Sequence, residues 1–522
     1  MNDITFSKED LEDIHAHGLT PETITGQLHR FQKGVFTPEL VAPCTLGNGV
    51  RPLLAEDEKR LQAAFRQAVN DGRVTKFVPA SGAATRMFKG LIAAWNRSDK
   101  TDLSSDRSVA ALIDKIEYLA CYEGLVKVMA RDGLNCRGMI ETGGHAAVLE
   151  YLLTDKGLNY ANLPKGLIPF HRYGKPSGDG NYSRTAFEEH LAEAAELFAD
   201  RNRLCRVHFT VPRQHEEAIR THLQAGGEYI LKQYGVTTDI SFSTQHPATD
   251  TIAAAGDNTP FRDSTGRLVF RPGGHGALLE NLAELQGDII FIKNIDNIAR
   301  EPVRRETGPA LAAMGGLLVE LQQGLFSLLQ RLTEGKPDAA AVEEIAARAS
   351  EYLNLPLAND LKGLSTEAAG EKLTARLNRP LRVCGVVKNA GEPGGGPFWI
   401  KDSRGNISAQ IIESAQVDMT HPGQKKIWRS STHFNPVIIA CGVRDFQERP
   451  FHLKDFADPL AGIITEKSKD GRSLQALEHP GLWNGAMAFW NTVFVELPPE
   501  AFNPVKTVFD LLREGHCADD GS

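Results

Sequence analysis

The stretch Lys76-Phe77-Val78-Pro79-Ala80-Ser81-Gly82-Ala83-Ala84-Thr85-Arg86 carries the strongest indication of the fold. Residues 76–78 predict a strand, and the small residues after it predict a tight loop that leads into a helix. Backbone N–H groups in such a loop can approach phosphate oxygens closely, and a helix N-terminus favours anions. The guanidinium of Arg86 can bind two phosphate oxygens at once. An ordinary strand-to-helix turn with a surface arginine has the same pattern, so the loop alone leaves both interpretations open.

Outward from this loop, predicted strands alternate with predicted helices. Short apolar runs, typical of strands buried on both faces, occur at 207–211, 240–242, 268–270 and 289–292. Helical stretches such as 186–198 and 277–285 separate them. Further strands are predicted at 381–387, 407–412, 437–441 and 493–497. This alternation predicts an α/β fold.

Four segments organise the chain. We expect a helical N-terminal region at 1–75, an α/β core at 76–304 with a helical insertion at about 90–160, a helical hairpin insertion at 305–378, and a return to strands at 379–522. Gly335-Lys336-Pro337 predicts the break inside the hairpin, because neither glycine nor proline continues a helix well.

Composition limits the classes of partner and the compartment. The chain has 522 residues and a formal net charge of −8, which disfavours binding to nucleic acid or to anionic membranes. Its seven cysteines include no CxxC pair, so neither a disulfide framework nor a zinc ribbon is indicated. The N-terminus is polar, and no run approaches the length of a transmembrane helix. We therefore expect a cytoplasmic protein.

Two further motifs fit a phosphorylated ligand. Lys165 lies between Pro164 and Gly166, where a stiffened backbone suits a fixed cation, although a solvated loop lysine is the more common case. The run Arg271-Pro272-Gly273-Gly274-His275-Gly276-Ala277 opens a predicted helix, and its three glycines allow close approach to a ligand. It matches neither a dinucleotide fingerprint nor a P-loop. A turn that needs positive φ accounts for one or two of these glycines, but not readily for all three.

Charged residues also follow a buried strand and a predicted helix start. Asp296 comes just after the strand at 289–292, where an α/β sheet places its ligands, and it could hold Mg²⁺ or simply form a turn.

Asn503 and Pro504 predict a helix N-cap and first helical residue. Lys506 would then lie in the first turn, where the helix dipole disfavours a cation unless an anion binds. A tolerated surface lysine is the alternative.

Polar loops near the later strands offer hydroxyl partners. Glu392, in a glycine-rich loop, and Asn435 could line a sugar pocket, or could belong to plain connecting loops. Trp483 is more typical of core packing than of a pocket wall.

The order of these motifs resembles that of sugar-nucleotide pyrophosphorylases. Val78–Met87 resembles their GxGTR signature, Leu163-Pro164-Lys165-Gly166 their Pro-Lys motif, Pro272–Gly276 their nucleotide loop, Asn294–Asn297 their Val-Asp-Asn segment, and Phe502–Lys506 with Asp510-Leu511-Leu512 the closing motif of UDP-sugar pyrophosphorylases. The matches span about residues 76–513. The whole sequence also resembles an uncharacterised bacterial family allied to these enzymes.

The resemblance implies a Rossmann-like, GT-A-type nucleotidyltransferase core with a mixed sheet, in which 76–304 binds the nucleotide and 379–522 holds the acceptor side. It implies an NTP and a phosphorylated small-molecule acceptor as substrates, and Mg²⁺ as cofactor. The residues that it assigns to catalysis are Arg86, Lys165 and Lys506. Those that it assigns to the nucleotide are Ala80, Ser81, Gly82, Thr85, Gly273, Gly274, His275 and Gly276. It assigns Asp296 to the metal, and Glu392 and Asn435 to the sugar.

Two departures from the family pattern matter. Ala84 stands at the second glycine of GxGTR, which predicts a wider or less flexible loop. A long helical stretch also separates the first loop from Lys165, which could reshape the acceptor pocket. Two alternatives remain. One is a GT-A glycosyltransferase, which an Asp-x-Asp motif would favour; Asn294-Ile295-Asp296 is not such a motif. The other is a nucleotide-sugar-binding regulator without turnover.

Overall fold

The computed structural model describes residues 5–97, 103–174, 181–285, 287–335, 337–391 and 394–517. The chain divides into two units that each draw on three segments. Unit 1 is Met1–Ala68, Thr244–Phe291 and Ala312–Leu497, and unit 2 is Val69–Ser243, Ile292–Leu311 and Pro498–Ser522. Each unit is described by itself.

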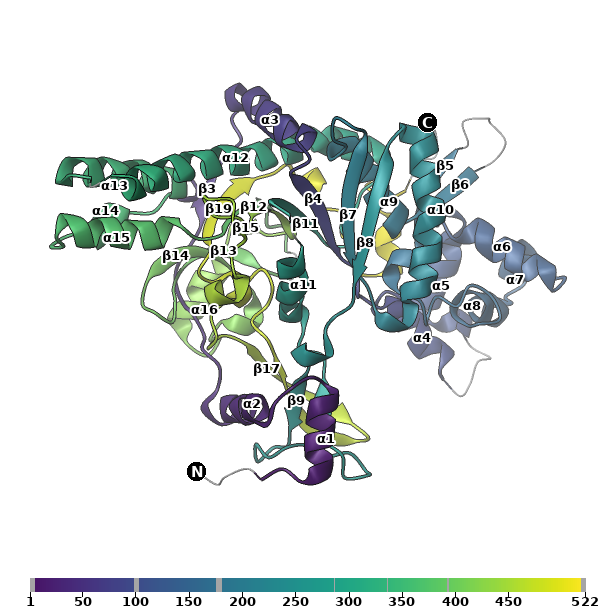
Figure 1. Ribbon diagram of the computed structural model, residues 1–522. Helices are drawn as coiled ribbons and strands as arrows, with labels where there is room; N and C mark the ends of the chain where they lie inside the picture. The colour runs from purple at the N-terminus through teal and green to yellow at the C-terminus, as the bar shows by residue number, and fades with distance from the viewer. Residues whose placement is uncertain are drawn as a thin grey trace. The chain divides into compact units, whose positions relative to one another are not determined.

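Unit 2 is built on parallel strands. Strands β4 (Val74–Pro79), β7 (Leu204–Thr210) and β8 (Thr237–Ser243) pair in this order, with Lys76 opposite Val207 and Val207 opposite Ile240. The connections carry helices α9 (Ala186–Leu197) and α10 (Glu216–Tyr234), which pack on these strands and on each other (Figure 1). Parallel strands with helical crossovers bury both faces of the sheet, as the apolar runs predict.

Smaller elements complete unit 2. The hairpin β5 (Pro169–Gly174) and β6 (Asn181–Thr185) precedes α9. The predicted helical insertion contains α4 (Lys89–Trp95), α5 (Arg107–Lys115), α6 (Tyr122–Arg131), α7 (Cys136–Glu141) and α8 (His145–Leu153). The C-terminal segment ends in a short 3₁₀ helix at Val508–Leu512.

Unit 1 contains a mixed sheet. Its strands lie in the order β2 (Thr45–Leu46), β3 (Gly49–Arg51), β19 (Asn491–Glu496), β12 (Leu381–Lys388) and β16 (Ile438–Gly442), and β15 (His433–Phe434) pairs with β12. Strand β12 runs parallel to β19 and antiparallel to β16. The strand β11 (Ile289–Lys293) passes from unit 1 into unit 2.

Two small antiparallel sheets also belong to unit 1. One is β1 (Glu39–Pro43), β13 (Gly396–Lys401) and β14 (Ile407–Ile412), and the other is β10 (Phe270–Arg271), β9 (Thr251–Ala254), β18 (Arg472–Glu478) and β17 (Ile463–Lys469). Helices α1 (Lys8–Ala16) and α2 (Pro21–Lys33) bury Ile14, Leu28 and Phe31 against β9 and β18. The N-terminal helices thus cover a sheet formed by much later segments.

Unit 1 also contains helices of very different lengths. They are α3 (Ala55–Asn70), α11 (Leu278–Glu284), α12 (Glu301–Thr333), α13 (Ala339–Leu353), α14 (Leu357–Asp360), α15 (Thr366–Leu377) and α16 (Pro422–Arg429); α3 and α12 continue into unit 2. Helix α12 is long and apolar enough to cross a membrane, with a mean hydropathy of 1.3, but 61% of that window is buried inside the protein. That burial is typical of a core helix.

The mixed α/β fold is confirmed, and α12 and α13 cover most of residues 305–353, which the sequence predicts to be helical. The prediction that residues 1–75 are helical is wrong for 39–51, where β1 and β3 pair with segments far along the chain and β2 pairs with β3. The strand predicted at 268–270 reduces to β10, in a small antiparallel sheet instead of the parallel one. Such short strands depend on distant partners and leave little local pattern.

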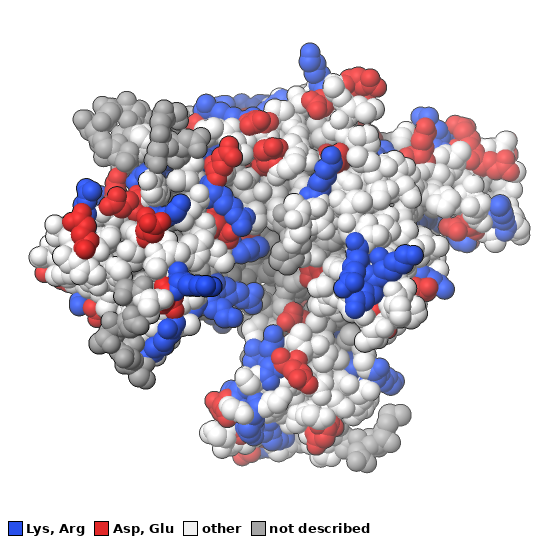
Figure 2. Space-filling view, turned by 180° about the vertical axis from the view of Figure 1, so that it is seen from behind, with Lys and Arg blue, Asp and Glu red and all other residues white. Residues whose placement is uncertain are grey.

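Charged side chains are unevenly distributed over the surface. Figure 2 shows small groups of lysine and arginine side chains among acidic ones on the face in view. The net charge of −8 therefore leaves room for local positive sites.

The close packing of α12 on α3 gives a stability prediction. A Cβ at Gly316 would lie 1.8 Å from the backbone oxygen of Leu61, so we expect Gly316→Ala to lower the free energy of unfolding by about 1–3 kcal/mol. Gly370, inside α15, has no neighbouring atom within 4 Å of a Cβ, and Gly370→Ala should raise stability by about 0.5–1 kcal/mol. Urea unfolding of both variants measures this; the same sign for both changes would contradict the packing described.

Candidate active site

The loop at 79–86 lies against the segment that contains Lys165. The N–H of Ala84 donates to the carbonyl of Leu163 (3.1 Å), and the N–H of Lys165 donates to the carbonyl of Gly82 (3.0 Å). The N–H of Ile295 in turn donates to the carbonyl of Pro79 (3.2 Å). Three motifs that are distant in sequence therefore meet within unit 2.

The loop residues differ in what they offer a ligand. Ser81, Gly82, Thr85 and Arg86 are exposed, and a Cβ at Gly82 would meet no atom within 4 Å. Ala80 is fully buried, and its N–H donates to the carbonyl of Thr210. Ala84 is also fully buried, so the alanine that replaces a glycine of the signature faces the interior. The open part of this loop is therefore the run from Ser81 to Ala83 and the Thr85-Arg86 pair.

Asp296 binds both predicted lysines. Its Oδ2 atom accepts a hydrogen bond from Lys165 Nζ and another from Lys506 Nζ, each at 3.0 Å. Lys165 Nζ also donates to the carbonyl of Val505 (2.8 Å). The side chain of Lys165 is 9% exposed and that of Lys506 is 61% exposed, so one cation is fixed in the interior and the other faces solvent.

The C-terminal segment pairs with the backbone beside Asp296 through an isolated bridge. Pro504 forms a bridge with Asn297, and the N–H of Val505 donates to the carbonyl of Asp296 (2.8 Å). The predicted helix start at Asn503 and Pro504 is therefore wrong. The 3₁₀ helix begins at Val508, with Thr507 as its cap, because pairing with Asn297 holds the preceding residues extended. Lys506 thus precedes the helix, and its charge is balanced by Asp296.

Opposite charges favour the ionised form of Asp296. Burial alone would raise the pKa of Asp296, but the charges of Lys165 and Lys506 outweigh it and lower that pKa. Burial lowers the pKa of Lys165; Asp296 opposes this effect, and repulsion from Lys506 and Arg86 adds to it. The charge of Arg86 is therefore felt at Lys165. Three cations around one carboxylate leave an excess of positive charge, which suits a polyanion such as a triphosphate.

A buried ion cluster supports this site. Glu193 on α9 forms ion pairs with Lys76 (2.6 Å) on β4 and with Lys293 (2.5 Å) at the end of β11, and all three side chains are at most 4% exposed. This cluster fixes β4, which precedes the loop at 79–86, and β11, which precedes Asp296. The sequence analysis missed this cluster, although a lysine within an otherwise apolar strand is the signal that could have identified it.

The glycines of the predicted nucleotide loop are needed by the chain's own packing. In unit 1, a Cβ at Gly273 would lie 2.3 Å from His479, and one at Gly276 would lie 2.1 Å from the carbonyl oxygen of Pro480. Gly274 has φ 75° and precedes a 3₁₀ turn at His275–Ala277. Close approach of the segment after β18 therefore accounts for these glycines, and contact with a nucleotide stays a prediction.

His275 takes part in an aromatic pair beside this turn. Its ring stacks on Trp483 with centroids 4.2 Å apart, and its Nδ1 accepts the N–H of Leu482 (3.1 Å). Because Nδ1 accepts this N–H, the ring N–H of His275 lies on Nε2, and burial lowers the pKa of His275. The indole N–H of Trp483 donates to Glu413 (3.0 Å). Trp483 is half-buried and is fixed from two sides. The sequence pattern alone favours core packing for this residue.

The two residues predicted for the sugar side have different outcomes. Asn435 is 2% exposed; its Nδ2 donates to the carbonyl of Gly385 and its Oδ1 accepts from the N–H of Val437. Val437 has φ 58°, a strained conformation for a β-branched residue, so Asn435 holds this turn. Glu392 lies outside the described residues.

The donor set for a metal is small. Among the described residues, no group of three or more His, Cys, Asp and Glu side chains is placed to hold an ion. Asp296 is a single carboxylate beside two ammonium groups, one of which faces solvent. Such a set fits Mg²⁺ that arrives with a triphosphate, because this ion takes one or two carboxylates and keeps phosphate and water oxygens.

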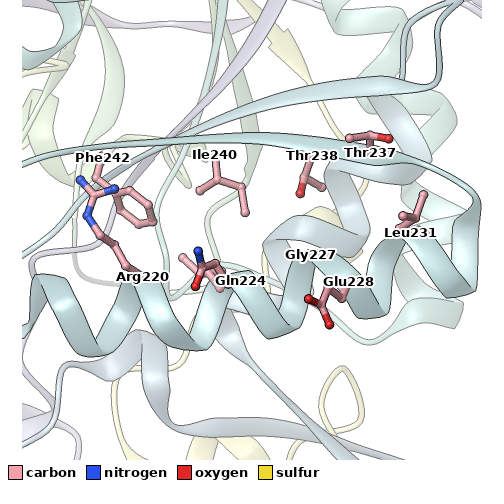
Figure 3. A pocket seen from close by; sticks show the side chains of 10 residues that line it. Arg220, Gln224, Gly227, Glu228, Leu231, Thr237, Thr238, Ile240 and Phe242 are labelled. Atoms are coloured by element: carbon pink, nitrogen blue, oxygen red, sulfur yellow. The ribbon is translucent and has the colours of Figure 1, made fainter.

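A separate groove in unit 2 lies between α10 and β8. It has a volume of about 600 Å³, and Figure 3 shows Arg220 beside Phe242 at one end and Leu231 at the other. The guanidinium of Arg220 lies 4.4 Å from the ring of Phe242 and binds Glu216 at 2.8 Å. Because this cation already has partners, the groove offers a phosphate less than the cluster around Asp296.

Comparisons with known proteins give one family and several similar structures. A family model described as a domain of unknown function, DUF4301, matches residues 7–517. No curated protein matches the chain. The structure of a UDP-glucose pyrophosphorylase mutant from Leishmania major has 13% identity and a TM-score of 0.43, with 97% of this chain and 79% of that chain covered.

Two other similar structures carry related descriptions. The uridine diphosphate N-acetylglucosamine pyrophosphorylase from Trypanosoma brucei has 11% identity and a TM-score of 0.46, with 97% of this chain and 82% of that chain covered. A putative UDP-N-acetylglucosamine pyrophosphorylase from Entamoeba histolytica has 10% identity and a TM-score of 0.37, with 87% and 82% covered.

The cluster around Asp296 predicts a pH-dependent contribution to stability. Asp296→Asn removes the charge that balances buried Lys165, so we expect a loss of about 3 kcal/mol near neutral pH. The lowered pKa of Asp296 makes its contribution complete above the ordinary aspartate pKa of about 4, and the contribution is lost as the pH falls through the lower folded value. The difference between wild type and Asp296→Asn should therefore shrink in acid.

Urea unfolding across this pH range measures the difference. Asp114→Asn, at an exposed position in α5, is the matched control and should change stability little at any pH. A difference that grows in acid, or an equal loss in the control, would contradict the role of the ion cluster.

Proposed function

The chain belongs to the family described as a domain of unknown function, DUF4301, and we propose that it is a nucleotidyltransferase that joins an NTP to a sugar 1-phosphate or similar phosphate acceptor, with release of pyrophosphate. The observation that carries this proposal is the convergence of Arg86, Lys165 and Lys506 around Asp296. Four motifs that resemble those of sugar-nucleotide pyrophosphorylases supply these residues.

The reaction requires alignment and charge balance. An oxygen of the acceptor phosphate attacks the α-phosphorus of the NTP, a new P–O bond forms, and the bond between the α-phosphorus and the bridging oxygen breaks. The electron pair leaves with pyrophosphate. The acceptor phosphate is already ionised near neutral pH, so no protein side chain has to serve as nucleophile or as base. Positioning of the two reactants can lower the barrier by about 7–11 kcal/mol.

The cations have different parts in this scheme. Lys165 is fixed by Asp296 and by the carbonyl of Val505, so it supplies a preorganised positive charge. Lys506 and Arg86 are exposed, and both can bind phosphate oxygens directly. The exposed backbone from Ser81 to Ala83 can approach the phosphates closely. The charge that develops on pyrophosphate as it leaves is the charge that these groups stabilise best.

Asp296 would hold Mg²⁺ together with the substrate phosphates. When bound, Mg²⁺ would polarise the phosphoryl oxygens and offset their charge. The exposed ammonium group of Lys506 could then bind phosphate oxygens, while Lys165 stays held by the carbonyl of Val505.

A screen of NTPs against sugar 1-phosphates, with and without Mg²⁺, tests the proposal by the release of pyrophosphate. Release that needs both substrates and Mg²⁺ is the expected result. Tight nucleotide binding without release or exchange of pyrophosphate would contradict catalysis and would support a regulator that binds nucleotide sugars.

Substitution of the exposed cations gives a quantitative prediction. We expect Lys506→Ala and Arg86→Ala each to lower kcat/KM by about 10²–10³, the usual cost of removing one preorganised charge at a transition state. Lys506→Arg should retain part of the activity, since it keeps the charge. Lys127→Ala, at an exposed position in α6 of the same unit, is the control and should leave kcat/KM unchanged. Equal activity of Lys506→Ala and wild type would show that the assignment of Lys506 is wrong.

A further inference from the structure

A cavity of about 540 Å³ in unit 1 has three cations on its walls. Arg30 reaches it from α2, Arg404 from the turn between β13 and β14, and Lys454 from a short 3₁₀ helix. Its volume lies in the range of small-molecule sites. None of these residues belongs to the cluster around Asp296, which lies in unit 2.

The carboxylates of this cavity have partners, and one of these partners is Lys454. Glu280 binds Lys454 at 2.7 Å, and Asp455 pairs with His452 at 2.9 Å. The Oδ1 atom of Asp458 accepts the N–H of Leu460 (3.0 Å). The lining therefore contains carboxylates as well as cations, but none of these three carboxylates pairs with the guanidinium of Arg404.

Arg404 is held in place yet keeps its hydrogen-bond donors. Its guanidinium carbon lies 3.6 Å from the ring centroid of Phe489, and its backbone N–H donates to Asp402 (2.9 Å). Within the part of the chain that the structure describes, no carboxylate oxygen lies within 4.0 Å of its guanidinium nitrogens. Stacking orders this planar group, so little entropy is lost when an anion binds.

Two further arginines add positive charge behind Arg404. Arg379 donates to the carbonyl of Ala375 (3.0 Å) and to that of Phe489 (3.4 Å), the residue on which Arg404 stacks. Burial lowers the pKa of Arg379 to about 10, and repulsion from Arg376 and Arg404 contributes to the shift. Three neighbouring guanidiniums repel one another, and a bound anion would relieve that repulsion.

Arg30 adds a second guanidinium to the cavity lining. Its terminal nitrogen donates to the carbonyl of Ala461, and its Nε atom is buried and has no hydrogen-bond partner. Burial lowers the pKa of Arg30, and the nearby charge of Asp458 opposes this effect. A bound anion would offset the cost of burying this positive charge.

We propose that this cavity binds the phosphoryl group of a small molecule, with Arg404 as its main ligand and with Arg30 and Lys454 also in its lining. A planar guanidinium matches two phosphoryl oxygens, and a dianion balances the excess charge of the arginines better than a monoanion does. Gly276 and Ala277 also line the cavity, so a bound molecule touches the turn that contains His275. The proposal is independent of the nucleotidyltransferase reaction.

Calorimetry with inorganic phosphate as the probe tests the site. The background is the full chain with Arg86→Ala and Lys506→Ala, which removes two exposed cations of unit 2. This background should still bind one phosphate, and adding Arg404→Gln should weaken binding at least about tenfold through loss of a charge-assisted contact. Arg404→Lys keeps the charge without the planar fork and should give an intermediate loss.

The matched control is Arg348→Gln, which removes an exposed arginine of unit 1 that lies over the ring of Tyr352. It should leave phosphate binding unchanged. Acetate at equal ionic strength should bind at least about tenfold more weakly than phosphate, because a carboxylate carries one charge.

No phosphate binding by the background, unchanged binding in both Arg404 variants, an equal loss in the control, or equal binding of acetate would each overturn the proposal. A loss in Arg404→Gln together with a melting temperature close to that of the background supports it. If Arg404→Gln unfolds, the result for Arg404→Lys decides.

Discussion

The ion cluster of Lys165, Asp296 and Lys506 is the interaction on which the candidate active site depends. Each lysine lies 3.0 Å from the same carboxylate oxygen, and the three residues come from parts of the chain separated by 131 and 210 positions. A buried carboxylate or ammonium without a partner is strongly unfavourable. The fold therefore gains specificity from this contact, because only the arrangement that brings these segments together neutralises the buried charges.

The surrounding structure holds this cluster in position. Glu193 ties Lys76 on β4 to Lys293 on β11, so the ends of both strands are fixed from within the core. Burial lowers the pKa of Lys76 to about 8, and the charge of Glu193 opposes this shift. The bridge between Asn297 and Pro504 then brings in Lys506 as part of an extended segment. Rigid strands and backbone pairing together supply the positioning that phosphoryl transfer needs.

Much of the local structure follows from sequence periodicity. The strand before the loop at 79–86, the helices of residues 90–160 and the hairpin of α12 and α13 have regular patterns and clear end signals. The strands at 39–51 do not, because each is only a few residues long and β1 and β3 are stabilised by partners near 399 and 494. Asn503-Pro504 carries a genuine helix-start signal that is overridden by pairing with Asn297.

The candidate site shows the same limit. Sequence order identified the four motifs that meet at Asp296, but it could not decide whether Lys165 is a solvated lysine or a fixed cation, because Val505 and Asp296 are its distant partners. The glycines at 273–276 were attributed to a ligand, whereas the segment from His479 to Pro480 already occupies the space beside them. Tertiary packing decides such cases.

Amine-reactive labelling followed by mass spectrometry tests the central claim most directly, because it reports on Lys506 in the intact chain without requiring turnover. Lys506 is exposed in the free protein and should be labelled readily. With Mg²⁺ and each of ATP, GTP, CTP and UTP in turn, at least one nucleotide should protect Lys506 while Lys127 stays fully labelled. Undiminished labelling of Lys506 with all four nucleotides would contradict the claim that this cluster binds a triphosphate.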